Sequence, residues 1–236
     1  MLATTVYTLV AQSRVLPKYR TALVMSSMAT FIAGYHYLRI FNSFNESSKA
    51  NAITIGTAQG AFNEAYRYVD WILTVPLLLV EVIAVLALAK SAAQSLMYRL
   101  VPASAAMIAL GYPGEISTNN GTKTLWGILS TIPFLYILYI LFVELGKSLE
   151  RQSDQVRATV KNLRILLIAT WGVYPITFIL AMNATGFDPA ALVSREIGYS
   201  IADVLAKCAY GLLIFKIARM KSAEDSKEFA ESEFRD

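Results

Sequence analysis

Residues 66–89 read YRYVDWILTVPLLLVEVIAVLALA. The stretch is mostly apolar and exceeds the about 20 residues that an α-helix needs to cross the hydrocarbon core of a bilayer. Three charged residues, Arg67, Asp70 and Glu81, nevertheless lie within it. Ionisable groups are costly inside a bilayer, so they face the protein interior and mark functional positions. The stretch therefore predicts a membrane-spanning helix that carries chemistry.

The composition of the whole chain agrees with this interpretation. Its 236 residues are 56% hydrophobic and only 16% charged, and the mean hydropathy is +0.47. Soluble domains average about 25% charged and about 45–50% apolar residues. The low charge content also excludes a disordered chain, and the single cysteine, Cys208, excludes a disulfide scaffold. An integral membrane protein in contact with the lipid bilayer remains, and no nucleic-acid partner is expected.

Six further apolar segments are separated by polar breaks. We expect the seven segments to form an all-α bundle of seven transmembrane helices. The segments are 2–13, 19–41, 66–89, 96–112, 124–145, 163–182 and 192–217. Among the breaks, 42–64 is expected to be a long loop with a small hairpin at 52–57, and turns are expected at 111–120 and 183–189.

The two ends of the chain depart from the pattern. Residues 2–13 are too few to span a core of about 30 Å, and no basic region before them indicates a signal peptide. We interpret them as the inner end of a first helix truncated at its N-terminal end; a short interfacial helix is the alternative. Residues 1–220 are expected to form the membrane domain. Residues 221–236 are charged and poor in large apolar side chains, which predicts a disordered cytoplasmic tail.

Lysine and arginine are distributed unequally between the two ends of the predicted bundle. Cytoplasmic loops of membrane proteins carry an excess of these residues. The N-terminus is therefore expected outside the membrane and the C-terminus in the cytoplasm. The predicted cytoplasmic side holds Arg14, Lys18, Arg20, Lys90, Arg99, Lys147, Arg151, Arg157, Lys161, Arg164, Lys216, Arg219, Lys221, Lys227 and Arg235, whereas the other holds only Arg39, Lys49, Lys123 and Arg195.

The charged residues of 66–89 share one helix face with Thr74. At about 100° per residue, Asp70 and Thr74 differ by about 40°, and Asp70 and Glu81 differ by about 20°. Asp70 and Glu81 lie about 16 Å apart along the axis, and Arg67 precedes Asp70 by about one turn. This row predicts proton-exchanging groups spread across the membrane. Interior ion pairs that only fix helix packing are the alternative.

Asp203 and Lys207 lie one turn apart in the last segment. An amine buried within 201–215 loses its hydration, which favours the neutral nucleophile needed for Schiff-base formation. A protonated imine needs counterions, and Asp203 and Asp70 are candidates. Simple pairing of Lys207 with Asp203 is the alternative. His36, the sole histidine, lies within the second segment and is a further interior candidate.

Four motifs occur in a characteristic order on these segments. They are RYVDWILTVP at 67–76, STIPFLYILY at 130–139, WGVYP at 171–175 and DVLAK at 203–207. They resemble the third, fifth, sixth and seventh helices of the microbial (type 1) rhodopsins. The resemblance covers essentially the whole chain except the start of the first helix and the tail.

This resemblance implies that all-trans retinal is bound to Lys207 as a protonated Schiff base, with Asp70 and Asp203 as counterions. It implies a bacterial multi-pass protein of the cell (inner) membrane that assembles as a pentamer or hexamer, and it implies no metal. Ordinary helix packing is the alternative for each isolated aromatic residue of the implied pocket. The pocket residues are Trp71, Thr74, Leu78, Met107, Gly111, Ser130, Phe134, Trp171, Tyr174, Pro175, Phe178 and Tyr199.

The triad Asp70, Thr74 and Glu81 resembles that of the proteorhodopsin-type outward proton pumps. A chloride pump would lack the first carboxylate, and a sodium pump would carry Asn, Asp and Gln. The resemblance implies a light-driven transporter rather than an enzyme. Asp70 would accept the proton, His36 would tune that acceptor, and Glu81, kept protonated by its dry surroundings, would be the donor. A photosensory rhodopsin that signals through a partner protein is the alternative; a retinal-free transporter or receptor disagrees with the Lys207 motif.

Three further positions carry expectations from the same resemblance. Arg67 and Glu196 would lie on the proton release path, although a solvated loop charge is the simpler interpretation of Glu196. Gly127 follows Trp126 where bacteriorhodopsin-like sequences have a second tryptophan. In the xanthorhodopsin-like branch a glycine here admits a carotenoid antenna, so Gly127 would open a window for a hydroxylated carotenoid (xanthophyll). A helix-packing glycine is the alternative. Leu78 matches a position associated with green absorption.

Overall fold

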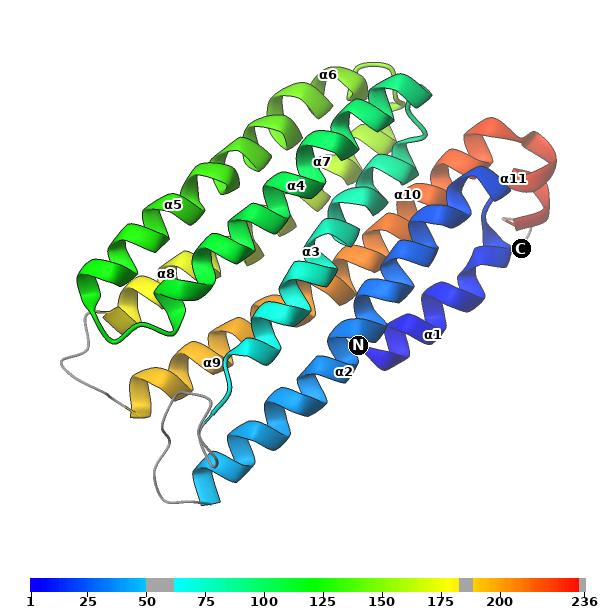
Figure 1. The fold of residues 1–236 in the computed structure, drawn as a ribbon. Helices are drawn as coiled ribbons and strands as arrows, with labels where there is room; N and C mark the ends of the chain where they lie inside the picture. The colour runs from blue at the N-terminus through cyan, green and yellow to red at the C-terminus, as the bar shows by residue number, and fades with distance from the viewer. Residues whose placement is uncertain (50–61, 183–188, 234–236) are drawn as a thin grey trace.

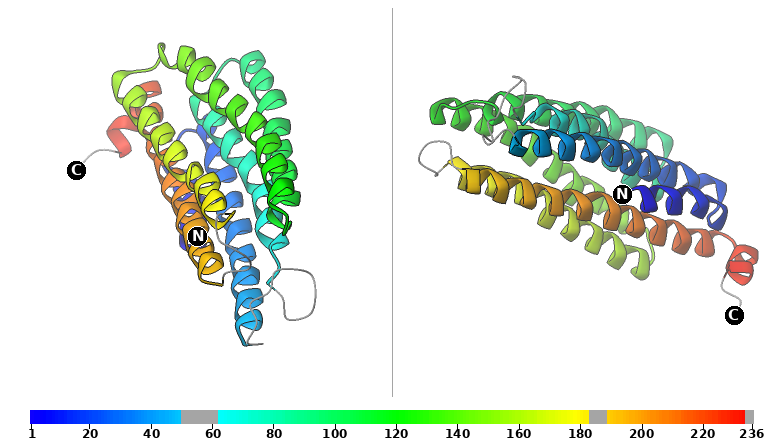
Figure 2. Two further views of the ribbon diagram at one scale, coloured as in Figure 1. Left: turned by 90° about the vertical axis from the view of Figure 1, so that its left-hand side faces the viewer. Right: turned by 90° about the horizontal axis from the view of Figure 1, so that it is seen from below.

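The computed structural model describes residues 1–49, 62–182 and 189–233. Long helices run side by side in one elongated bundle (Figure 1), and two further views show the same common direction (Figure 2). The helices of the described residues are α1 Leu2–Val10, α2 Arg20–Lys49, α3 Ala65–Leu86, α4 Lys90–Glu115, α5 Asn120–Tyr139, α6 Leu145–Leu149, α7 Asp154–Trp171, α8 Val173–Met182, α9 Pro189–Val204, α10 Tyr210–Asp225 and α11 Lys227–Glu233.

Three pairs of consecutive helices each continue as one rod. A π-helical turn, Ile140–Glu144, joins α5 to α6, and a second, Leu205–Ala209, joins α9 to α10. Only Gly172 separates α7 from α8. The described residues thus form seven rods followed by the short α11, which confirms the predicted seven-helix bundle.

Within the described ranges, three rods are long and apolar enough to cross a membrane by length and composition alone. They cover Ala65–Leu86, Asn120–Leu149 and Asp154–Leu180. Large apolar side chains also lie exposed on the outside of the bundle, among them Ile132, Ile179 and Leu180. A large exposed apolar surface is costly in water and favourable in contact with lipid. The outer surface is therefore that of a protein that lies within a bilayer.

The structure corrects several predicted helix ends. The second helix continues to Lys49, well into the break predicted at 42–64. The fourth helix runs from Lys90 to Glu115 and includes Pro113 and Gly114, which were expected in a turn. Hydropathy marks where apolar residues stop, whereas a helix can continue beyond that point with exposed polar side chains. The predicted hairpin at 52–57 and most of the turn at 183–189 lie outside the described residues.

The first helix is short, and hydroxyl groups attach it to its neighbour. Thr5 Oγ1 lies 2.9 Å from Thr30 Oγ1, and Thr8 Oγ1 lies 2.7 Å from Ser27 Oγ. Met1 lies about half-way along the bundle beside α2 (Figure 1). A Cβ on Gly34 would come within 2.9 Å of Leu2 Cδ2, so the small glycine allows this close approach.

The charged tail is helical, which corrects the disorder expected for residues 221–236 as far as Glu233. The last rod continues to Asp225, and α11 follows it. Glu233 Oε1 pairs with Arg14 Nη2 at 2.5 Å and with Arg219 Nη2 at 3.0 Å. Lys18 Nζ lies 2.8 Å from Asp225 Oδ2. Acidic tail residues thus order against basic residues of the loop before α2 and of α10, contacts that composition does not reveal.

Candidate functional site

A buried amine lies near the middle of the bundle, on the rod formed by α9 and α10. Lys207 belongs to the π-helical turn Leu205–Ala209 and is 2% exposed. Its Nζ lies 2.9 Å from Asp203 Oδ1 and 3.1 Å from Asp70 Oδ2. Turns of this kind occur often at functional sites. The amine and the two carboxylates that the sequence singled out are therefore in direct contact.

Asp203 is surrounded by donors. Tyr37 Oη donates to Oδ2 at 2.7 Å and Tyr174 Oη to Oδ1 at 2.5 Å. Trp71 Nε1 lies 3.0 Å from Oδ1, and Arg67 Nη1 pairs with Oδ2 at 3.6 Å. Charge-assisted hydrogen bonds of this kind stabilise an ionised carboxylate. Asp203 is accordingly held as a fixed negative charge beside the amine.

Asp70 has fewer partners than Asp203. Its carboxylate pairs with Lys207 but accepts no hydrogen bond from any other side chain of the described residues. Thr74 Oγ1 donates to the main-chain oxygen of Asp70 at 2.9 Å and so leaves the carboxylate free of that bond. His36 is buried and interacts electrostatically with Asp70. Of the two acids at the amine, Asp70 is the one with unused capacity to take a proton.

Sequence reasoning missed Tyr37. It stands next to His36 in a segment rich in aromatic residues, and nothing in that pattern distinguishes it. In the structure its hydroxyl donates to Asp203 and accepts a hydrogen bond from Arg67 Nη1 at 3.0 Å. Tyr37 therefore connects the charged groups of α3 and α9.

A cavity of about 150 Å³ reaches the amine of Lys207. Aromatic rings pack around one end of it: Trp71 lies 4.9 Å from Tyr174 and 5.4 Å from Tyr199, measured between ring centroids. Of the predicted pocket residues only Thr74 is absent from the wall; it is fully buried, and its hydroxyl bonds to the main chain of its own helix. The wall comprises Tyr68, Trp71, Val75, Leu78, Met107, Ile108, Gly111, Glu115, Gly127, Ser130, Thr131, Phe134, Trp171, Tyr174, Pro175, Phe178, Tyr199, Asp203, Ala206 and Lys207.

Glu81 lies on α3 between the amine and the end of the bundle that carries α11. It is fully buried, and neither carboxylate oxygen has a hydrogen-bond partner among the described residues. Ser26 and Tyr210 interact electrostatically with it. A Cβ on Gly211 would come within 2.2 Å of Ser26 Oγ, so the glycine leaves room for this orientation of the serine hydroxyl. The sequence identified Glu81 but not its neighbours Ser26 and Tyr210.

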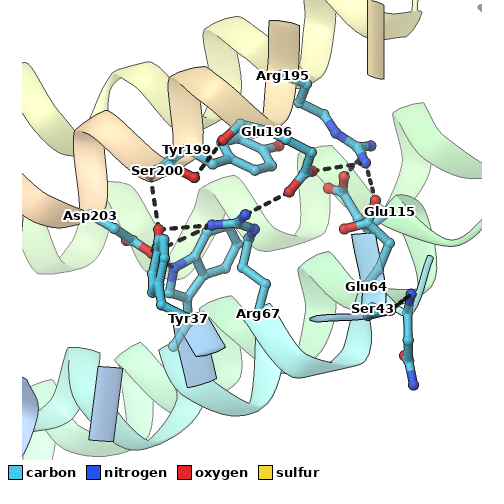
Figure 3. Close-up of polar contacts among 12 residues, drawn as sticks. Tyr37, Ser43, Glu64, Arg67, Glu115, Arg195, Glu196, Tyr199, Ser200 and Asp203 are labelled. Carbon is cyan, nitrogen blue, oxygen red and sulfur yellow. Dashed lines mark hydrogen bonds and ion pairs between the residues drawn. The ribbon is translucent and has the colours of Figure 1, made fainter. Parts of the chain in front are cut away.

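On the other side of the amine, Arg67 leads to a second group of charges (Figure 3). Its Nη2 pairs with Glu196 Oε2 at 2.5 Å. Glu196 is 7% exposed, so the simpler expectation of a solvated loop charge is wrong. Arg195, which the charge distribution placed on the outer side, is buried beside it, together with Glu64 and Glu115, which no sequence pattern singled out.

Comparisons with known proteins identify the family of this chain. The family model described as bacteriorhodopsin-like protein matches residues 1–220. The chain belongs to the bacteriorhodopsin-like family. This rhodopsin is 30% identical to the green-light absorbing proteorhodopsin of Gamma-proteobacterium EBAC31A08, over 94% of the chain and 84% of the relative. The predicted membership of the microbial (type 1) rhodopsins is thereby confirmed.

Solved structures agree. The crystal structure of thermophilic rhodopsin superposes with a TM-score of 0.87 at 45% identity, covering 95% of this chain and 90% of the other. The crystallographic structure of xanthorhodopsin, described as a light-driven ion pump with dual chromophore, gives 0.84 at 46% identity, with coverages of 94% and 89%. These proteins share the seven-helix bundle with this rhodopsin.

The family binds retinal, and the residues present fit it. The wall of the cavity is dominated by aromatic and aliphatic side chains, as a long hydrocarbon ligand requires. Lys207 supplies one amine at that wall for covalent attachment, with two acids beside it. A Cβ on Gly111 would already lie 3.4 Å from both Ser130 Oγ and Tyr68 Oη, so glycine keeps the cavity open there.

Proposed function

We propose that this rhodopsin is a light-driven outward proton pump with retinal attached to Lys207. One observation carries the proposal: the Lys207 amine lies between Asp70 and Asp203, while Glu81 lies isolated further along the same helix as Asp70. Retinal bound at the Lys207 nitrogen would supply light absorption and a light-triggered change in the proton affinity of that nitrogen. The printed descriptions of the relatives, proteorhodopsin and a light-driven ion pump, support the same function.

The two acids at Lys207 have different tasks. Asp203 is stabilised as an anion by its hydroxyl, indole and guanidinium partners. It therefore keeps its charge, orients the nitrogen and does not compete for the proton. Asp70 Oδ2, 3.1 Å from Nζ and without any other hydrogen-bond donor among the described residues, accepts that proton. His36 acts on Asp70 electrostatically and sets how readily Asp70 retains it.

Glu81 returns a proton to the Lys207 nitrogen from the other direction. A carboxyl group without charged or hydrogen-bonding partners in an apolar region favours its neutral form. It therefore holds a proton at rest, about 16 Å from Asp70 along the helix axis. Acceptor and donor on opposite sides of one nitrogen give the transfer a direction.

The distribution of lysine and arginine orients the bundle in the membrane. The end of the bundle near α11 holds most lysines and arginines, so we place it in the cytoplasm. Glu81 then takes its proton from the cytoplasm, and Asp70 and Arg67 lie toward the outside. The multi-pass protein would reside in the bacterial inner membrane.

The test is the light-induced pH change of a cell suspension that expresses the full chain with added retinal. We expect acidification of the medium in light, and a protonophore should abolish it. Lys207→Ala, which removes the attachment amine, is the matched control without function. A visible absorption band without any pH change would reject the pump and favour the photosensory alternative.

We also propose that Gly127 admits a hydroxylated carotenoid as a light-harvesting antenna. Gly127 lines the cavity, and among the described residues a Cβ there would meet only Phe178 Cε1, at 3.6 Å. Its neighbours Leu125 and Ile128 are exposed, so this wall lies close to the lipid-facing surface. The 46% identical xanthorhodopsin is described as having a dual chromophore.

Added carotenoid should give an induced circular dichroism band and energy transfer to retinal. The substitution Gly127→Trp should remove both effects while it preserves the retinal band, because the new ring fills the opening. If both effects survive in Gly127→Trp, the antenna assignment is wrong.

A further inference from the structure

Arg164 lies where α7 passes the π-helical turn between α5 and α6. Its Nε and Nη2 atoms are buried, and neither has a hydrogen-bond partner among the described residues. The guanidinium carbon lies 5.6 Å from the ring centroid of Phe142, and a Cβ on Gly146 would lie 3.9 Å from Nη1. The aromatic ring and the glycine therefore accommodate the guanidinium, but no acidic side chain of the described residues acts on it.

The acid of the π-helical turn is already paired with another base. Glu144 is the last residue of this turn, and it faces Arg99 of α4. Arg99 Nη1 donates to Glu144 Oε1 at 2.8 Å, and Nη2 lies 2.7 Å from Oε2. A guanidinium that contacts both carboxylate oxygens satisfies the acid in a geometrically specific way. Glu144 therefore does not neutralise Arg164.

The π-helical turn explains this division. A turn of this kind contains one residue more than the α-helix around it. Each residue rotates an α-helix by about 100°, so the extra residue changes the direction of every side chain that follows. In this rod, Gly146 faces Arg164 while Glu144 faces Arg99. The irregular turn thus leaves a guanidinium beside α6 without an acid opposite to it.

Two lysines add to the positive charge of Arg164. Lys161 lies one turn before Arg164 on α7, and Lys147 directly follows Gly146; both lysine side chains are exposed. The same end of the bundle carries α11 (Figure 1), and Ser153, the residue before α7, contacts Glu224 of α10 there. Three bases in one region repel one another unless an anion lies between them.

Further from this end, the same two rods present apolar side chains to the outside. Ile165 and Ile168 share the helix face of Lys161 and are exposed, as is Val143 on the π-helical turn. Both rods are spanning segments that bury little of their apolar surface within the bundle. Positive charge is thus followed directly by a lipid-facing apolar surface. The α6–α7 patch comprises Phe142, Val143, Lys147, Lys161, Arg164, Ile165 and Ile168.

We propose that the α6–α7 patch binds one anionic phospholipid. The planar fork of Arg164 holds the phosphate, Lys147 and Lys161 add charge, and the acyl chains cover Ile165 and Ile168. Basic sites between transmembrane helices are recurrent places for anionic lipid headgroups. A lipid fits better than a free phosphate ion, because a free ion would leave the apolar part of the patch uncovered. This binding is independent of the proposed pumping.

The test measures which lipid the full, retinal-loaded chain retains. Native mass spectrometry follows its release from nanodiscs that contain equal amounts of phosphatidylcholine and phosphatidylglycerol. We expect one phosphatidylglycerol per chain in preference to phosphatidylcholine. Arg164→Gln should lower this retention by about tenfold, because a charge-assisted contact is lost. Arg164→Lys keeps the charge without the fork and should give an intermediate value. Lys90→Gln, which removes an exposed base at the same end of the bundle, should retain the lipid.

Thermal bleaching of the retinal band distinguishes a lipid from a free anion. Phosphatidylglycerol should raise the bleaching temperature of the parent protein above its value in phosphatidylcholine alone, since a ligand of the folded state stabilises it. Arg164→Gln should lose this rise, and inorganic phosphate added to phosphatidylcholine nanodiscs should not produce it. An equal rise with inorganic phosphate would show a free-anion site and overturn the lipid assignment.

The retinal band also reports whether each variant is folded. If Arg164→Gln lacks this band, the double variant Lys147→Gln/Lys161→Gln, altered only at exposed positions, decides by the same loss of retention. Equal retention of both lipids by the parent protein would overturn the proposal. An unchanged preference in folded Arg164→Gln would also overturn it, as would an equal loss in Lys90→Gln, which would indicate attraction by overall charge.

Discussion

The two halves of the bundle on either side of Lys207 differ in how they hold polar groups. Toward the end opposite α11, Asp203, Arg67, Glu196 and Arg195 form a continuous series of ion pairs and hydrogen bonds. Toward the α11 end, Glu81 stands without a hydrogen bond among buried apolar side chains. A connected network can redistribute charge quickly, whereas an isolated acid in a dry region changes its protonation only when water or a proton reaches it. In the proposed orientation, the connected network forms the outer half of the bundle and the region around Glu81 forms the inner half.

The largest effect is expected from Asp70→Asn, at the boundary between the halves. The amide keeps the size of the side chain but cannot accept the proton from Lys207. We expect complete loss of the light-induced acidification, measured in the cell suspension. Normal outward acidification by this variant would contradict the assignment of Asp70 and with it the division into two halves.

Glu81→Gln tests the inner half. Removing a general acid at a proton-transfer step typically slows that step by about 100-fold or more. We expect slow recovery of the proton on the Lys207 nitrogen, measured by flash absorption spectroscopy, while the transfer to Asp70 keeps its rate. Ser26→Ala, which removes a polar neighbour but leaves the acid, should slow the recovery less. Equal slowing of both steps would show that the halves are not separate.

The protonation of Glu64 tests the outer half. Burial raises the pKa of Glu64 to about 8, so its carboxyl carries a proton below that pH and has lost it above that pH. The infrared carbonyl band of this neutral acid in the dark protein should therefore be present at pH 7 and decline as the pH rises through about 8. The Glu64→Gln variant is the control and should lack that titrating band. A carbonyl band that remains constant well above about pH 8 would contradict the assignment to Glu64.

The smallest effect is expected at the inner end of α3. Ala87 ends this helix with φ 47°, a left-handed conformation that favours glycine. Ala87→Gly should stabilise the protein by about 1 kcal/mol, measured as a higher temperature of thermal bleaching. Because Ala87 lies beyond the dry region of Glu81, the recovery rate should stay unchanged. A changed rate would mean that the end of α3 takes part in opening the inner half.

Much of the site could be predicted from local spacing. Asp203 and Lys207 are one helical turn apart, and Asp70, Thr74 and Glu81 recur on one face, so helix geometry alone brings each set to one side of its helix. The charge distribution predicted an orientation, and the hydropathy pattern predicted seven helices. Motif resemblance added most residues of the cavity wall, although Thr74 does not line it. The wall residues that it missed are Tyr68, Val75, Ile108, Glu115, Thr131 and Ala206.

The groups that the sequence could not reveal are those joined across long separations. Glu64 and Arg195 are 131 positions apart, and Tyr37 and Asp203 are 166 apart. In the sequence, Glu64 and Arg195 resemble ordinary loop charges and Tyr37 resembles an ordinary helix tyrosine. No local sequence pattern indicates which distant residue each of them will contact. The same reason explains the tail, whose order depends on Arg14 and Arg219 meeting Glu233.

By itself, the sequence determined the membrane-embedded helical class, the reactive lysine and the row of acids on α3, since these depend on apolar length and on the period of a helix. Only the tertiary structure decided that Asp203 has many hydrogen-bond partners while Asp70 has few. It also decided that Glu81 is buried without a hydrogen bond among the described residues, and that three glutamates contact Arg195. These properties depend on which helices face each other, and that choice depends on the packing of the whole bundle.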